Sequence, residues 1–315
     1  MWLWGYNIAI TSYTACLRIA ALFHRKARLW VEGRSTLFER LETFTFEKTL
    51  WFHCASVGEF EQGLPLIRLL QQDYPESTLL LTFFSPSGYS YALEHYPEFQ
   101  ISYLPTDTPA HAKRFLQQVR PQAAFFIKYE FWFNFLIVLN ERKIPVYLIS
   151  TIFRDNQWFF RRGTGSFLKQ LRLVTHYFVQ DEHSANILKS KGINQVTVSG
   201  DTRFDRVISI SKNPFSVIPI ENWVKDAFVI VAGSTWEPDE NILLEYLKKD
   251  TTGCKLIMVP HEVDRNHLDQ LTSKLSKKKI RRRQRKSDPR IRPKNMKSGF
   301  KKIEFRRKQK RGRPK

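Results

Sequence analysis

Cysteine is scarce in this sequence, and its spacing argues against two common scaffolds. The chain has 315 residues and only three cysteines, Cys16, Cys54 and Cys254, which lie far apart within apolar runs. No C-x-x-C pair is present, which argues against a disulfide framework and against a zinc site. We therefore interpret all three as packing residues of a protein from a reducing compartment.

Acidic residues are nearly absent from the C-terminal end. Residues 273–315 contain 22 Lys and Arg but only two acids, whereas residues 1–272 have a net charge of just +1. Because 273–315 also lacks apolar periodicity, we expect a disordered basic tail. Its last six residues, KRGRPK, resemble an AT-hook core that would bind the DNA minor groove. The alternative is a charge run without a partner.

Charge is also scarce near the N-terminus. Residues 2–23 form an apolar run in which only Arg18 is charged, and Arg25, Lys26 and Arg28 follow at once. The length suits a membrane span, but polar residues within the run favour a helix in the membrane interface nearly as well. The third possibility is an amphipathic helix packed on the body. We assign 1–44 to a membrane anchor and linker, with the following chain on the cytoplasmic side.

Between the two ends, strand-like and helix-like stretches alternate. Runs rich in β-branched and aromatic residues occupy 49–55, 78–84, 100–104, 123–129, 146–150, 176–180, 196–199, 228–233 and 255–259. Helical periodicity lies between most of them, at 60–73, 109–119, 131–142, 182–191 and 239–249. This alternation predicts an α/β fold with parallel sheets. A proline-bearing stretch from Asn213 separates a domain over 45–212 from a second, unfinished domain over 213–272.

Familiar catalytic motifs are missing, because the sequence has no Walker loop, no G-x-G-x-x-G and no H-E-x-x-H. In doubly wound folds, ligands bind at the carboxyl ends of the strands, so the polar residues there are the candidates. Ser56, Gly58 and Glu59 follow the first strand. Ser56 and Glu59 have the spacing of a capping box, but a carboxylate at this point could equally act as a general base.

Other strand ends supply further candidates. Lys128 and Glu130 follow the fourth strand, where they form either a functional pair or a surface ion pair. Arg203 follows the seventh strand and could receive an anion, although a turn with internal salt bridges explains it as well.

The second domain adds two more strand ends. Ser234 and Thr235 follow the eighth strand, where backbone N–H groups suit a phosphate. Pro260 and His261 follow the ninth strand, and a lone histidine is more often structural than a ligand.

Taken together and in this order, these segments resemble the 3-deoxy-D-manno-octulosonic acid (Kdo) transferases of lipopolysaccharide synthesis. The matching pieces include HCASVGEFEQGLPLI, TFFSPSGY, SYLPTDTP, KYEFWFN, GDTRFDRV, AGSTWEPDE and VPHEVDR. The resemblance implies a GT-B-like architecture, with a complete N-terminal Rossmann-like domain and an incomplete second one. It also implies an inverting transfer of Kdo from CMP-Kdo to a lipid A precursor, lipid IVA, without a cofactor or metal. The expected location is the cytoplasmic face of the inner membrane, in contact with its lipids.

The resemblance also assigns roles to single residues. Glu59 matches the catalytic base, and Arg203 matches a basic residue that steadies charge in the transition state. In the E-x-E element of the family the first acid is a second functional residue; Lys128 takes its place here and Glu130 matches the other acid, so we expect Glu130 to be the third catalytic residue. The expected substrate-binding residues are Ser56, Gly58, Lys128, Ser234, Thr235, Pro260 and His261. Candidates for contact with a phosphorylated lipid acceptor are His24, Arg25, Lys26, Arg28 and Arg34.

After about residue 275 the resemblance ends, and the basic tail stands where the family continues its donor domain. We interpret the tail as an out-of-frame reading, which predicts little or no transferase activity for this chain. The alternative from another class is a DNA-associated protein that binds nucleic acid through the tail.

Overall fold

The chain forms two units, each with its own sheet and its own core. The computed structural model describes residues 2–128, 130–157, 160, 165–212, 218–249, 254–261 and 265–277. The first unit is Met1–Pro214 and the second is Phe215–Lys315.

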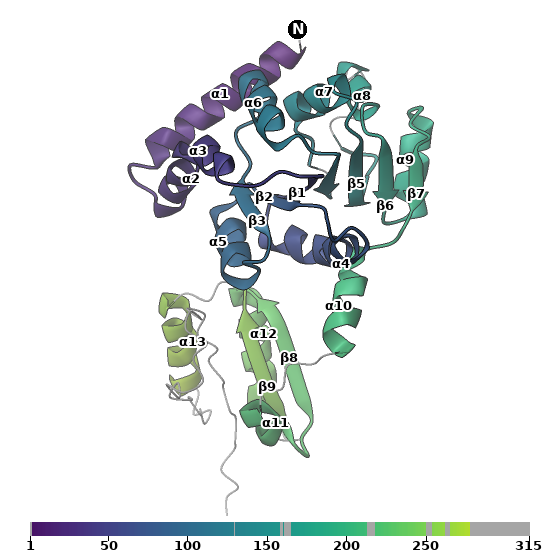
Figure 1. Cartoon of the computed structure of the whole chain (residues 1–315). Helices are drawn as coiled ribbons and strands as arrows, with labels where there is room; N and C mark the ends of the chain where they lie inside the picture. Colours follow the sequence, from purple (N-terminus) through teal and green to yellow (C-terminus); the bar gives the residue numbers. More distant parts are fainter. Residues whose placement is uncertain are drawn as a thin grey trace, which may run out of the picture. The chain divides into compact units, whose positions relative to one another are not determined.

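The first unit is built on a seven-stranded parallel sheet in the order β3-β2-β1-β4-β5-β6-β7 (Figure 1). Its strands are β1 (Leu50–Cys54), β2 (Leu79–Phe83), β3 (Gln100–Tyr103), β4 (Ala123–Ile127), β5 (Val146–Thr151), β6 (His176–Val179) and β7 (Val196–Val198). Six lie within one of the first seven expected runs and β5 extends one residue beyond its run, to Thr151, which confirms the predicted α/β class. The chain moves outward from β1 to β3 and then returns to β4, so the direction of winding reverses between β1 and β4.

Helices connect the strands and cover the sheet. They are α4 (Val57–Asp73), α5 (Pro86–His95), α6 (Pro109–Val119), α7 (Phe133–Glu141), α8 (Gly165–Leu171), α9 (Glu182–Ser190) and α10 (Thr202–Lys212). Figure 1 shows α6 and α7 on one side of the sheet and α4 on the other. The side chain of Trp51 on β1 faces α6 and α7, where its ring meets Phe115 and Phe135.

Local sequence signals explain where several helices begin. A serine, threonine or aspartate side chain accepts a hydrogen bond from the backbone N–H three residues further on, which satisfies a donor that the helix leaves free. These N-caps are Ser56, Ser85, Thr108 and Asp181. Proline follows two of them in the first turn, at Pro86 and Pro109, where its missing N–H costs nothing.

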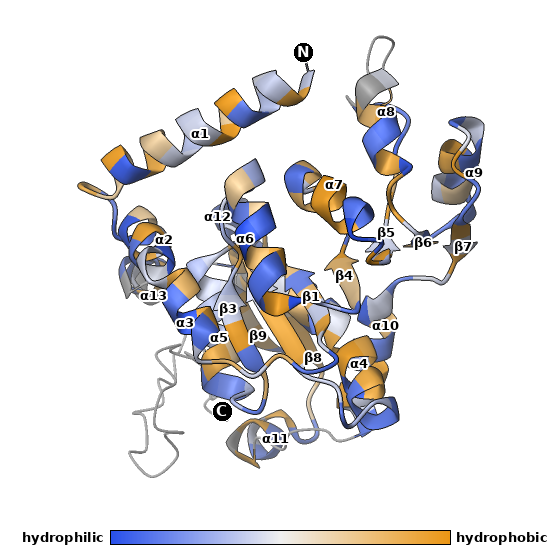
Figure 2. Cartoon of the chain, turned by 45° about the horizontal axis from the view of Figure 1, so that its top comes forward, coloured by the Kyte–Doolittle hydropathy of each residue, from blue (hydrophilic) through white to orange (hydrophobic). Residues whose placement is uncertain are grey.

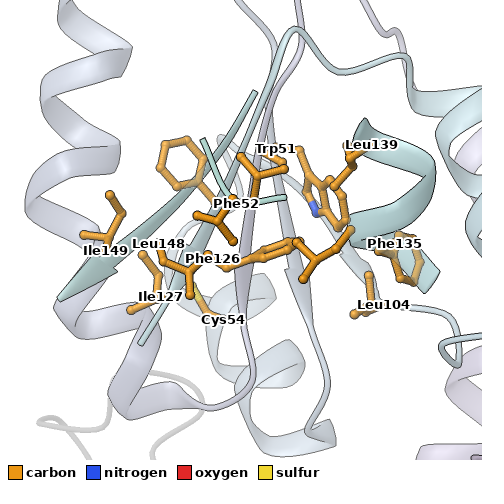
Figure 3. Packing of buried hydrophobic residues seen from close by; sticks show 14 of the residues in the cluster. Trp51, Phe52, Cys54, Leu104, Phe126, Ile127, Phe135, Leu139, Leu148 and Ile149 are labelled. Carbon is orange, nitrogen blue, oxygen red and sulfur yellow. The ribbon is translucent and has the colours of Figure 1, made fainter. Parts of the chain in front are cut away.

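The core of the first unit lies along the central strands. Every residue of β1 and β2 is buried, which is typical of strands covered on both faces. Figure 3 shows Trp51, Phe126 and Phe135 packed together, and the ring of Trp51 lies 5.2 Å from that of Phe126. Trp51 Nε1 donates to Thr82 Oγ1 at 2.8 Å, so even the polar atom of this buried ring has a partner.

Three helices precede the sheet: α1 (Trp2–Ala20), α2 (Arg25–Ser35) and α3 (Leu37–Glu42). They belong to the first unit, because Trp2 and Tyr6 of α1 pack on Phe133, and Leu41 of α3 is part of the core. Within the described part of the chain, no helix combines the length and the apolar character that a membrane span requires. Cys16 on α1 is exposed, so our interpretation of it as a packing residue was wrong, whereas Cys54 and Cys254 are buried.

A buried carboxylate ties α1 to the body. Asp107 is fully buried and accepts hydrogen bonds from the Tyr6 hydroxyl at 2.6 Å and from the N–H groups of Asn134 and Phe135 at 3.2 and 3.1 Å. It therefore caps the N-terminus of α7 from another segment. Burial raises the pKa of Asp107 to about 6, against the lowering effect of these hydrogen bonds.

The second unit contains a parallel pair of strands, β8 (Val229–Thr235) and β9 (Lys255–Pro260), with α11 (Ile218–Val224), α12 (Glu237–Lys249) and α13 (Arg265–Lys277). Leu244, Leu256, Met258 and Leu271 form its small core. Because α13 continues to Lys277, residues 273–277 are helical, and our boundary for the tail was a few residues too early. The rest of the predicted tail, with its hook-like end and the proposed change of reading frame, lies outside the described residues.

The link between Tyr6 and Asp107 can be tested by removing one hydroxyl. We expect Tyr6→Phe to lower the free energy of unfolding by about 1.5–3 kcal/mol, because it deletes a hydrogen bond to a buried carboxylate. Urea unfolding of the full chain measures this. Tyr13→Phe on the same helix removes a hydroxyl from an exposed ring, and should change the free energy by less than about 0.5 kcal/mol. Equal effects of the two variants would contradict the role of Asp107.

Candidate active site

The candidate site lies at the carboxyl ends of β1 and β4. These strands are direct neighbours, with His53 opposite Phe126, and the winding of the sheet reverses between them. Such a reversal leaves a space above the strand ends, because the two following helices leave toward opposite faces of the sheet. Glu59 follows β1, and Lys128 and Glu130 follow β4. The fold therefore brings together three residues that the sequence separates.

Glu59 is held by a complete capping box at the start of α4. The Ser56 N–H donates to Glu59 Oε2 at 3.1 Å, and the Glu59 N–H donates to Ser56 Oγ at 3.4 Å. Glu59 is buried, and burial raises its pKa, while the charge of Lys128 and the N–H groups of Ala55 and Ser56 oppose the shift. A raised pKa makes a carboxylate a stronger base, so the capping geometry and the chemistry of a base coexist in this residue.

Glu130 completes a pair of carboxyl groups. Its pKa is raised to about 7, mainly by burial and then by the negative charge of Glu59. Two carboxylates that repel each other resist ionising together, so near neutral pH Glu130 carries a proton in part of the molecules while the positive Lys128 favours the charged form of both. Glu130 is half-buried, so a fully exposed surface ion pair with Lys128 does not describe it.

The backbone at Lys128 has an unusual conformation. Its φ is +66°, in the left-handed region that a side chain with a Cβ adopts at a cost. The neighbouring strand β5 holds it there, because the Lys128 N–H donates to the Ile149 carbonyl at 2.8 Å and the Thr151 hydroxyl donates to the Lys128 carbonyl at 3.1 Å. Position 58 does not require a glycine for space, because a Cβ added to Gly58 would lie 4.0 Å from Ser56 Oγ.

Arg203 lies at the start of α10, paired with Asp201. The Asp201 carboxylate accepts from the Arg203 N–H at 2.9 Å and from its Nε at 2.7 Å, and also pairs with Nη2. This is the turn with an internal salt bridge that the sequence allowed. The Arg203 side chain is nevertheless 67% exposed, so part of the guanidinium faces solvent and can meet an anion.

Arg34 differs from our expectation for a residue that contacts a phosphorylated lipid. Its guanidinium donates to the carbonyls of Leu104 and Phe84, both at 2.9 Å, and its Cζ lies 4.0 Å from the ring centre of Trp30 and 4.8 Å from that of Tyr103. Burial lowers its pKa to about 9. The expectation for Arg34 was wrong, because an amphipathic side chain beside aromatic rings serves packing as well as charge.

In the second unit, the predicted residues gather at the ends of β8 and β9. Ser234 has a left-handed φ of +54°, and the His261 N–H donates to the Thr235 carbonyl at 2.9 Å. The Thr235 hydroxyl is buried and donates to Glu240 at 3.3 Å, so it is not directed to solvent. Pro260 ends β9. His261 is exposed and stacks on Trp236, with ring centres 4.6 Å apart.

Our sequence reasoning missed three residues at these strand ends. Gln62 contacts Asp201, directly before α10, Glu61 contacts Arg206 of α10, and Trp236 stacks on His261. Gln62 and Glu61 follow Glu59 within the same helix, so a search for polar residues on the first two turns of α4 would have found them. Nothing in the spacing of Trp236 predicts its contact. Within the described residues, no group of three or more His, Cys, Asp and Glu side chains could hold a metal ion.

Solved structures place this architecture in the class of α/β proteins with a GT-B-like fold. UDP-GlcNAc 2-epimerase from Neisseria meningitidis shares the fold at a TM-score of 0.53 and 18% identity, over 73% of this chain and 69% of that one. The MnaA protein of S. aureus matches at a TM-score of 0.53 and 15% identity, over 73% of this chain and 65% of that one. The predicted fold class is confirmed.

Sequence comparison then identifies the family. The family model described as 3-deoxy-D-manno-octulosonic-acid transferase (kdotransferase) matches residues 31–206. The chain belongs to this family, as its motifs predicted.

Curated relatives agree with this assignment. The 3-deoxy-D-manno-octulosonic acid transferase of Rickettsia bellii is 26% identical over 69% of this chain and 52% of its own length. Those of Haemophilus influenzae and Aquifex aeolicus are both 27% identical, over 69% and 68% of this chain and 52% and 55% of their own lengths. The chain thus spans about half the length of these relatives.

The electrostatic link between the two carboxyl groups leads to a test that needs no substrate. In Glu59→Gln, the pKa of Glu130 should fall below its wild-type value of about 7, because the repelling charge is removed. Carbon-13 NMR of labelled glutamate side chains, titrated with pH, measures this. Glu141→Gln at the end of α7 is the control and should leave the Glu130 titration in place. An unchanged pKa in Glu59→Gln would show that the two groups are not coupled.

Proposed function

We propose that this chain is a glycosyltransferase that moves Kdo from CMP-Kdo to a lipid A precursor, with Glu59 as the general base. The observation that carries the proposal is the position of Glu59: a buried carboxyl with a raised pKa, at the switch point of a GT-B-like sheet. Membership of the kdotransferase family supports the choice of sugar and acceptor.

The proposed step is a single displacement. Glu59 takes the proton of an acceptor hydroxyl, the hydroxyl oxygen attacks the anomeric carbon of Kdo from the side opposite the nucleotide, and the bond to CMP breaks with its electron pair leaving on CMP. Inversion follows from that geometry. Because Glu59 Oε2 accepts the Ser56 N–H, we assign the proton to Oε1. The free N–H groups of Arg203 would stabilise charge that develops on the leaving group.

The remaining site residues have supporting roles in this proposal. A proton on Glu130 keeps the site from carrying two adjacent negative charges, while Lys128 balances the one that remains. Ser56 orients the base, and Gly58 lies in the same turn. On the donor side, we assign CMP-Kdo to the ends of β8 and β9, where Ser234, Thr235, Pro260 and His261 lie.

We also propose that α1 binds the inner-membrane surface on its cytoplasmic side. Large apolar side chains on one face of α1 and the turn after it are exposed: Trp4, Ile8, Ile19, Leu22 and Phe23. Figure 2 shows apolar patches spread along α1. His24, Arg25, Lys26 and Arg28 follow and are exposed, so the surface combines apolar and cationic groups. This composition suits a helix that lies in the headgroup region of an anionic bilayer.

The role of Glu59 as a base can be separated from its role as a cap. Glutamine also completes a capping box, so Glu59→Gln should keep the stability of the chain while transfer of Kdo falls by roughly 10²–10⁴-fold. Ser56→Ala is the opposite control, because it should cost about 1 kcal/mol of stability. The assay uses protein in excess over acceptor, so that slow transfer can be followed. Wild-type activity retained by Glu59→Gln would contradict the proposed base.

Membrane binding has a direct test with vesicles. Full-length protein should co-sediment with anionic phosphatidylglycerol vesicles more than with phosphatidylcholine vesicles, and added salt should weaken the binding. Trp4→Ser with Leu22→Ser should reduce it severalfold by removing apolar area from the surface. The matched control is Leu69→Ser with Leu93→Ser, which removes exposed apolar side chains from α4 and α5. Equal losses in both double variants would argue against α1 as the binding surface.

A further inference from the structure

The helix that carries Arg203 is held to the body mainly by polar contacts. None of the residues of α10 is buried, and Phe204, Val207 and Ile208 are more than half exposed. Figure 1 shows α10 beside α4, and the two helices are in contact. Because little apolar area is buried at this junction, its hydrogen bonds and ion pairs decide where α10 lies.

Two adjacent residues of α4 supply two of these contacts, beside the hydrogen bond that the Thr202 N–H of α10 donates to Ser150 Oγ at 3.4 Å. Gln62 Nε2 donates to Asp201 Oδ1 at 3.2 Å, and the Glu61 carboxylate pairs with Arg206 of α10. The Tyr91 hydroxyl donates to Glu61 Oε1 at 2.8 Å, which orients the carboxylate toward Arg206. We use the name α4–α10 clamp for Glu61, Gln62, Asp201 and Arg206.

The clamp also holds Arg203, through Asp201. The Asp201 carboxylate that receives Gln62 is the same one that holds the N–H and guanidinium of Arg203. Glu61 and Gln62 in turn come two and three residues after Glu59, on the first turns of one helix. A single rigid helix therefore presents Glu59 and also fixes the segment that presents Arg203.

The burial of Gln62 indicates that its contact is more than a surface detail. Gln62 is only 2% exposed, and among the described residues its Oε1 has no hydrogen-bond partner. An unsatisfied buried acceptor costs free energy, and an apolar side chain would avoid that cost. The hydrogen bond that Gln62 Nε2 donates to Asp201 offsets this cost.

We propose that Glu61 and Gln62 are positioning residues, which hold Arg203 in a fixed place relative to Glu59 through the α4–α10 clamp. This rests on the proposed function, in which Arg203 stabilises charge and Glu59 accepts a proton. Displacement of a charge-stabilising group by about 1 Å can cost roughly 100-fold in rate, so two contacts at the base of α10 can control turnover without touching substrate.

The structural half of the proposal is tested by hydrogen exchange. In full-length Glu61→Gln/Gln62→Leu, amide exchange in α10 should rise about tenfold or more relative to wild type, while exchange in α9 stays unchanged. Arg68→Gln is the matched control, because it removes another ion pair of α4, that with Glu98, without contacting α10. Unchanged exchange in α10 of the double variant would overturn the clamp.

The effect of the clamp on turnover is tested by combining the double variant with Arg203→Ala. The double variant should lower kcat for Kdo transfer roughly 10- to 100-fold with little change in the KM for the acceptor. In an Arg203→Ala background, the same two substitutions should have almost no further effect, because the group that they position is already gone. A purely structural role would instead give losses that multiply in the combined variant, and that result would overturn the proposal.

The outcomes separate this inference from the proposed function. Wild-type protein that transfers no Kdo would overturn the proposed function, and the positioning role with it, while the exchange experiment would still decide whether the clamp exists. Wild-type protein that transfers Kdo at a rate unaffected by Glu61→Gln/Gln62→Leu would overturn the positioning role alone.

Discussion

The pairing of β1 with β4 is the constraint on which the rest of the first unit depends. These two parallel strands form the centre of the sheet, and Leu50 opposite Ala123 sets a register that continues to His53 opposite Phe126. Trp51 fills the layer between this pair and helices α6 and α7. Because the strands are parallel and in this register, their carboxyl ends meet at one edge, and the residues that follow them share one environment. A shift of one strand by one residue would place Trp51 and Phe126 on opposite faces of the sheet.

Burial at that edge gives the site its chemistry. A carboxyl group that is removed from water resists ionisation, and the negative charge of Glu59 raises this cost further for Glu130. The charge of Lys128 and the backbone donor of Ser56 oppose this cost, while the neighbouring strand holds Lys128 itself in a left-handed backbone conformation. Conformational strain and desolvation therefore occur together at one strand end, a combination that is common where a fold gives up stability for function.

Charged side chains that are removed from water at other positions have structural roles. Arg34 donates to three backbone carbonyls among aromatic rings, and Asp107 caps α7 while holding Tyr6. Asp107 is buried and Arg34 is half-buried, and the hydrogen bonds of both are made within the protein. Glu59 Oε1 and the exposed part of Arg203 differ, because they leave capacity for a partner. Burial alone therefore does not identify a functional charge.

Local patterns in the sequence determined the elements and the candidates. Apolar runs of strand length placed all seven strands of the first sheet, and capping residues such as Ser56 and Thr108 marked helix starts, because both signals depend on neighbours in the chain. Tertiary structure alone decided which strand ends meet, that Arg34 lies among aromatic rings, that Gln62 reaches Asp201 and that Trp236 stacks on His261. Desolvation and charge coupling act through space between residues far apart in sequence. The sequence could therefore name Glu59 and Glu130, but only the fold makes them a pair.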